Sequence, residues 1–200
     1  MARYRNSRII PIILIVFISV IAIAALVSLA RAVFFSGTPQ AAEQVDVSRD
    51  ALLRTDADRS VIMTVRGPIV ADESFQSYRI TVTPNARTLV TYNGYLDRVV
   101  DEVRLPNNVA AYEEFVFALD RAELSRGESL LGDLNDVRGI CATGRVVEFA
   151  ILNKQDIVKQ LWTSTCRGST GSLDASVDQL TNLFVSQIPD ARTTINKINL

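Results

Sequence analysis

The two cysteines, Cys141 and Cys166, are the residues of this 200-residue chain with the clearest chemical potential. A thiol becomes a nucleophile or a metal ligand when a histidine or another group favours its thiolate form, and the chain contains no histidine. Two cysteines are also too few for a structural zinc site, which takes four ligands. We therefore interpret them as a disulfide, formed in an oxidising compartment.

The segment between the cysteines has the pattern of a β-hairpin. A turn centred on Asn153 and Lys154 would place the two cysteines opposite each other, and Glu148 opposite Lys159. Opposed residues on an antiparallel ladder lie about 4.5–5.5 Å apart, which is within disulfide range. The turn, the charge pair and the cysteines thus agree on one register. Its apolar face would carry Val147, Phe149, Ile151, Val158 and Trp162.

The polar segment after Cys166 is the best candidate for a functional loop. It consists of small and hydroxyl-bearing residues with one arginine, and it precedes an expected helix. Because helix N-termini favour anions, we predict a candidate anion or ligand loop here, with an ordinary strand-to-helix connection as the alternative. Its residues are Arg167, Gly168, Ser169, Thr170, Gly171 and Ser172.

Other catalytic and metal-binding patterns are weaker. Ser/His/Asp catalysis and histidine-based zinc sites need a residue that the chain lacks. Adjacent acids such as Asp72 and Glu73 point to opposite faces of a strand, so they do not converge as the paired carboxylates of a glycosidase must. Asp133, Asn135 and Asp136 match only part of a calcium loop. We expect no catalytic residue, metal or cofactor, although an envelope enzyme that uses carboxylates stays open.

An uninterrupted apolar run at residues 9–30 predicts a transmembrane helix. Its 22 residues carry no charge, and as a helix they would span about 33 Å, enough for the hydrocarbon core of a bilayer. Arg3, Arg5 and Arg8 precede the run and Arg31 follows it, so the positive-inside rule predicts a cytoplasmic N-terminus. The run is longer than the core of a signal peptide. We expect an uncleaved anchor, with a cleaved signal peptide as the alternative.

Composition divides the chain into four parts. Residues 1–8 are the expected cytoplasmic N-terminus, 9–30 the anchor, 31–47 a linker and 48–200 an extracytoplasmic domain long enough to bury its own core. The chain has 21 basic and 22 acidic residues. It therefore lacks the excess of basic residues that is typical of nucleic-acid-binding proteins. The expected partners are the lipid bilayer and an unidentified protein or cell-envelope component.

Within the domain, the apolar periodicity indicates an α+β fold. Alternation over short segments predicts strands, wider spacing predicts helices, and Asn93-Gly94 is a strong hairpin signal. After the transmembrane helix we expect an antiparallel sheet of about six strands with two helices packed on one face. Outside the cysteine hairpin, the expected elements are a helix at 48–53 capped by Ser48, strands at 60–66, 76–83, 87–92 and 95–105, a helix capped by Asn107 or Asn108 and ending near 124, a helix at about 174–188, and an edge strand at 193–200.

The combined pattern resembles a known group of proteins. The sequences CATGRVVEFAILN and LWTSTCRGSTGSL, with the anchor and a helix ending in IPD, are similar to uncharacterised single-pass membrane-anchored proteins of small-genome candidate-phylum bacteria. The resemblance implies no activity and no site residue. The function we expect is a non-catalytic, membrane-anchored extracytoplasmic binding or assembly module. A subunit of a membrane complex that uses the anchor as its interface, and the carboxylate enzyme named above, stay open as alternatives.

Overall fold

The computed structural model divides the chain into two units, Met1–Val45 and Asp46–Leu200. The predicted anchor and linker lie almost wholly outside the described residues, and the four described residues of the anchor are helical and exposed. In the described part of the chain, no helix is long and apolar enough to cross a membrane. The anchor therefore stays a prediction. The described residues are 17, 19, 21, 23, 47–130 and 132–200.

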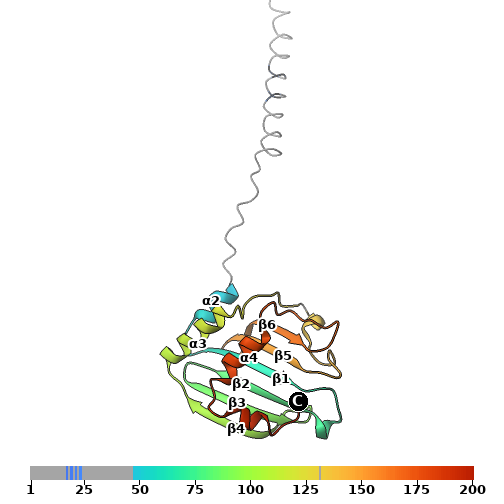
Figure 1. Cartoon of the computed structure of the whole chain (residues 1–200). Coiled ribbons are helices and arrows are strands. Elements are labelled where there is room, and N and C mark those ends of the chain that lie inside the picture. The colour runs from blue at the N-terminus through green and yellow to red at the C-terminus, as the bar shows by residue number, and fades with distance from the viewer. Residues whose placement is uncertain (1–16, 18, 20, 22, 24–46, 131) are drawn as a thin grey trace, which may run out of the picture. The chain divides into compact units, whose positions relative to one another are not determined.

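The unit Asp46–Leu200 is built on one antiparallel sheet of six strands in the order β4-β3-β2-β1-β5-β6 (Figure 1). The first four strands form a meander, and the chain then crosses the sheet to add β5 on the free side of β1. The predicted α+β class and six-stranded antiparallel sheet are confirmed. The strands are β1 Arg59–Arg66, β2 Gln76–Val82, β3 Ala86–Asn93, β4 Arg98–Pro106, β5 Val146–Asn153 and β6 Asp156–Ser164.

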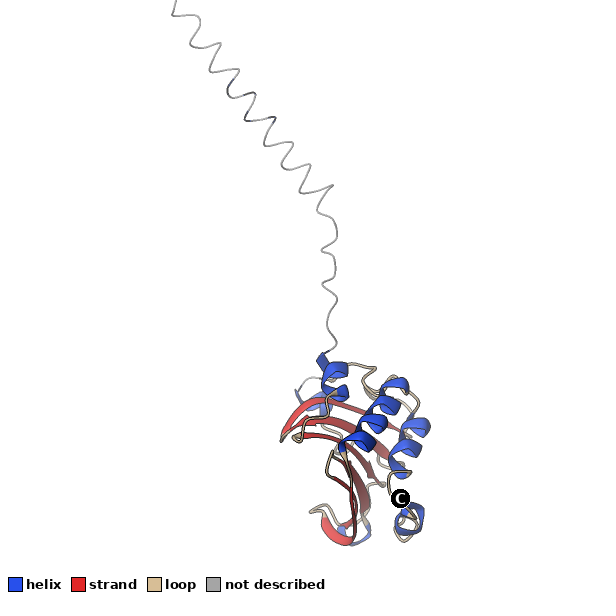
Figure 2. Cartoon of the chain, turned by 90° about the vertical axis from the view of Figure 1, so that its left-hand side faces the viewer, coloured by secondary structure: helices blue, strands red, loops and turns tan. Residues whose placement is uncertain are grey.

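The helices α2, α3 and α4 pack on the same face of this sheet (Figure 2). The side chain of Asn108 caps α3 by accepting a hydrogen bond from the backbone N–H of Ala111, at 2.9 Å. Of the two predicted caps, Asn108 is therefore the correct one. Ser48 lies inside α2 rather than before it. The bounds are α2 Val47–Leu53, α3 Val109–Arg121, α4 Val177–Val185 and α5 Ala191–Ile195, with short 3₁₀ turns η1 Asp72–Ser74 and η2 Gly132–Asn135.

The main core lies between the helices and this face of the sheet. Alternate residues of each strand point toward the helices, as the period of two in the sequence predicts. Phe184 of α4 is fully buried, and its ring centroid lies 5.3 Å from that of Phe115 and 5.8 Å from that of Phe149. Other buried members include Leu52, Val61, Met63, Ile80, Leu89, Tyr112, Leu119 and Leu180.

A second, smaller cluster covers the opposite face at β5 and β6. Val146 and Trp162 belong to it, and each is one residue away from a strand position that faces the main core. Because successive side chains of a strand point to opposite faces, the two clusters lie on either side of the sheet. Val137 and Cys141, from the segment before β5, complete the second cluster.

The predicted edge strand at 193–200 is wrong, because the chain forms helix α5 there. Asp190 turns the chain with a φ of 57°, and Ala191 and Ile198 are then buried in the main core. Lys197 pairs with Asp101 of β4 at 3.0 Å. Apolar residues in this short segment fit helical spacing as well as alternation, so periodicity could not decide between the two structures.

The predicted β5–β6 hairpin is present, but its turn lies further along the chain than predicted. Asn153 is opposite Asp156, so the turn residues are Lys154 and Gln155. Lys154 adopts a φ of 59°, in the left-handed region that tight hairpin turns require. Its amino group also lies 3.9 Å from the carboxylate of Asp58.

A bulge moves the register of this hairpin further from the prediction. It lies between Ile151 and Leu152, and it shifts the pairing of the two strands by one further residue from the predicted register. Glu148 is consequently opposite Trp162, and Lys159 is opposite Ile151. The predicted Glu148–Lys159 pairing is therefore wrong, because it assumed a ladder without a bulge.

Candidate functional site

Four loops meet at one end of the sheet. β1 ends at this end beside the start of β2 and β5, and β6 also ends here. The chain enters the domain through α2 at the other end, where Asp50 and Arg54 lie beside Arg59 at the start of β1. The loop end is therefore the end that lies away from the point of entry. The loops span residues 67–75, 94–97, 136–145 and 165–172.

The Cys141–Cys166 disulfide ties two of these loops together, as predicted from the sequence. The two Cα atoms are 5.5 Å apart. Both cysteines lie outside the ladder, one before β5 and the other after β6. The pairing is thus confirmed, but it results from the convergence of the loops and not from the predicted register.

Arg145 is held between the disulfide and the first residue of β5. Its backbone N–H donates to the hydroxyl of Thr165 at 2.9 Å, and the N–H of Thr165 donates to the carbonyl of Arg145 at 3.0 Å. Gly144 makes this approach feasible, since a Cβ atom there would lie 2.2 Å from the Thr165 hydroxyl oxygen. The disulfide and this bridge fix the direction in which the Arg145 side chain leaves the backbone.

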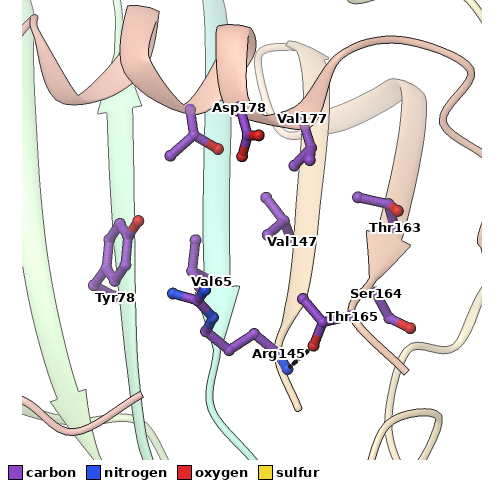
Figure 3. A pocket seen from close by; sticks show the side chains of 10 residues that line it. Val65, Tyr78, Arg145, Val147, Thr163, Ser164, Thr165, Val177 and Asp178 are labelled. Atoms are coloured by element: carbon purple, nitrogen blue, oxygen red, sulfur yellow. Dashed lines mark hydrogen bonds between the residues drawn. The ribbon is translucent and has the colours of Figure 1, made fainter. Parts of the chain in front are cut away.

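A pocket of about 150 Å³ lies between these strand ends and helix α4. Figure 3 shows Arg145 beside the ring of Tyr78 and Asp178 across the pocket on α4, with Thr163 and Thr165 along one side. The floor is apolar and comes from valines of β1, β5 and α4. The lining residues are Val65, Tyr78, Arg145, Val147, Thr163, Ser164, Thr165, Val177, Asp178 and Thr181.

Tyr78 is the most buried polar residue of this pocket, with 5% of its surface exposed. It occupies a helix-facing position of β2, opposite Val65. Burial raises the pKa of its hydroxyl to about 12, while the charge of Arg145 acts in the opposite direction. The hydroxyl is therefore protonated at neutral pH. Among the described residues, it has no hydrogen-bond partner, which leaves it as a donor that faces the pocket.

The other hydroxyl groups of the pocket differ in whether their protons are already donated in hydrogen bonds. Thr163 donates its hydroxyl proton to the carbonyl of Thr170, and Ser164 donates to that of Ser169. The hydroxyl of Thr165 only accepts in its bond with Arg145, so its proton is free for another acceptor. The pocket therefore offers several donors near Arg145, and the carboxylate of Asp178 as an acceptor on α4.

The predicted ligand loop, residues 167–172, runs along the outer edge of β6. Ser172 accepts from the N–H of Trp162 at 3.1 Å and donates its own N–H to the carbonyl of Trp162 at 2.9 Å. The hydroxyl bonds from Thr163 and Ser164 hold the same loop. The structure brings the residues on either side of this loop into the pocket, but not the loop itself. Anion binding by the loop stays a prediction.

Two glycines of this loop provide a matched test of its close packing. Gly168 and Gly171 both have a φ of +83°, so alanine is strained at either position. At Gly168 a Cβ atom would have open space, whereas at Gly171 it would lie 2.1 Å from the carbonyl oxygen of Trp162. We expect Gly168→Ala to lower the free energy of unfolding by about 1 kcal/mol and Gly171→Ala by about 2–3 kcal/mol. Thermal unfolding followed by tryptophan fluorescence measures both, and equal effects would contradict this packing.

In the acidic segment before the disulfide, Asp136 is engaged by a neighbouring arginine. The carboxylate of Asp136 is hydrogen-bonded to Arg138, which lowers its pKa to about 2. In the described part of the chain, no group of three or more acidic or sulfur side chains is close enough to hold a metal ion.

Sequence reasoning missed most of the pocket because its residues come from distant segments. Tyr78 is on β2, Arg145 precedes β5, and Asp178 and Thr181 are on α4. One signal was available, since Tyr78 alternates with Ile80 and Val82 on the core-facing side of its strand. A tyrosine at the end of such a stripe often places its hydroxyl at a polar boundary.

The comparisons with known proteins give no further assignment for this pocket. No protein-family model matches the chain, and no curated protein matches its sequence.

Proposed function

We propose that this chain is a membrane-anchored, extracytoplasmic binding module without catalytic activity, and that its ligand enters the pocket beside α4. The observation that carries the proposal is Tyr78, a residue with 5% of its surface exposed, whose hydroxyl lines the pocket and has no partner among the described residues. The hydroxyl is open to the pocket, so a ligand there can accept a hydrogen bond from it.

Two independent features support an extracytoplasmic location for the C-terminal unit. The Cys141–Cys166 disulfide persists in oxidising compartments, such as the space outside the cytoplasm. The arginines before the apolar run at residues 9–30 predict the same orientation, with the C-terminal unit outside. The two arguments share no residues.

Photo-crosslinking in intact cells tests the binding function. A photoreactive residue is placed at Thr165, at the edge of the pocket, and as a matched control at Thr193 of α5, which is also exposed. We expect an adduct at position 165, absent at 193 and lost when Arg145→Gln is introduced. Adducts at both positions, at neither, or insensitive to Arg145→Gln would contradict the proposal.

Replacement of the anchor separates this function from that of a complex subunit. Exchanging residues 9–30 for an unrelated apolar helix should leave the adduct at position 165 unchanged if the pocket carries the function. Loss of the adduct would favour the alternative in which the anchor helix is the interface with a membrane complex.

A further inference from the structure

Three donor groups line the pocket. Arg145 contributes a guanidinium group, Tyr78 an unpartnered hydroxyl and Thr165 a hydroxyl whose proton is free. Figure 3 places the guanidinium group beside the ring of Tyr78. The guanidinium group of Arg145 is matched by a carboxylate, which can accept two hydrogen bonds from it at once.

An acceptor lies across the pocket from Arg145 (Figure 3). Asp178 is in the first turn of α4. Among the described ion pairs, none involves Asp178 or Arg145. Two opposite charges thus line one pocket without neutralising each other. The carboxylate of Asp178 is matched by an ammonium group.

The space between the two charges sets the size of the ligand. The pocket measures about 150 Å³, and Val65, Val147 and Val177 form its apolar lining. That volume suits a molecule of a few heavy atoms with a small aliphatic side chain.

We propose that the pocket binds a small zwitterion of the α-amino-acid type, with its carboxylate at Arg145, its ammonium group at Asp178 and Tyr78 as a further hydrogen-bond donor in the pocket. This inference rests on the proposed function and names its ligand class. A free amino acid and the zwitterionic dipeptide of two small residues share this chemistry. Their relative affinity distinguishes the two sources.

The binding test uses the full-length chain in detergent micelles and equilibrium dialysis of radiolabelled D,L-alanine. Unlabelled alanine and alanylalanine should displace the label. N-acetylalanine, which lacks the ammonium group, and alaninamide, which lacks the carboxylate, should compete roughly ten- to a hundredfold more weakly, the effect of one lost charged hydrogen bond.

Variants assign each charge to its residue. Asp178→Asn should remove the preference for alanine over N-acetylalanine, and Arg145→Gln should remove the preference over alaninamide. Tyr78→Phe should weaken alanine binding by a factor of about ten while both preferences remain. Arg192→Gln, at an exposed position of α5, is the matched control and should bind alanine with unchanged affinity.

Four results would overturn the inference. Equal competition by alanine and N-acetylalanine would show a carboxylate site alone. Loss of alanine binding in Arg167→Gln, with normal binding in Arg145→Gln, would place the ligand on the loop at 167–172. Absence of alanine binding, with the adduct at position 165 still formed in cells, would reject the ligand class but leave the binding module. Absence of both would reject the two proposals together.

Discussion

Replacing Phe184 with alanine is expected to lower the free energy of unfolding by about 3–5 kcal/mol, the largest effect of any single substitution proposed for this domain. Phe184 is fully buried and joins the rings of Phe115 on α3 and Phe149 on β5. It therefore links both long helices to the sheet. Alanine would remove these ring contacts and leave a cavity that α3 and the sheet, each held by other contacts, cannot fill by small shifts.

Phe117→Ala is the matched control for this substitution. Phe117 lies on α3, two residues from Phe115, but 52% of its surface is exposed. Its loss should change the free energy of unfolding by no more than about 1 kcal/mol. Thermal unfolding, followed by the fluorescence of Trp162, should show Phe184→Ala melting roughly 10 °C below the parent chain. Equal shifts in the two variants would contradict the assigned core.

Removing the disulfide is expected to have the second largest effect, about 3 kcal/mol. The bond joins residues 25 positions apart, so in the unfolded chain it restricts a loop of that length. In the folded chain, Cys141 also packs with Val137, Val146 and Trp162 in the smaller cluster. Loss of the bond should therefore shift the fluorescence of Trp162 before the main core melts.

The double variant Cys141→Ser and Cys166→Ser tests this effect, with reduction of the parent chain as a second route to the same state. Both should lower the melting temperature by a similar amount. A reductant added to the double variant serves as the control and should change nothing. A melting temperature that is the same with and without the bond would show that the converging loops are held by other contacts, such as the bond from Ile69 N–H to the Ala142 carbonyl.

Local patterns in the sequence were sufficient to predict most of the sheet and its helices. Alternation identified β1 and β2 to within one residue at either end, and Asn108 marked the start of α3. These features depend on neighbouring residues, which a linear sequence displays directly. The register of the β5–β6 hairpin depends instead on a bulge at Ile151, and no residue type in the sequence predicts such a bulge.

The disulfide could be predicted from the sequence, whereas the pocket could not. The cysteines could be paired because the chain holds only two. The pocket requires Tyr78, Arg145 and Asp178 to meet, and the strand order β2-β1-β5 with α4 above it brings them together. The sequence alone does not specify that order. The prediction therefore placed the functional loop at 167–172, between two segments that line the pocket.

Thiol alkylation in intact cells most directly tests whether this disulfide-bonded domain functions outside the cytoplasm. Cells are acid-quenched and treated with an alkylating agent under denaturing conditions, and the chain is then captured and weighed. We predict no alkyl adduct before reduction and two after it, one for each cysteine. Two adducts on the unreduced chain would show free thiols in the cell, and would contradict both the oxidising compartment and the extracytoplasmic function.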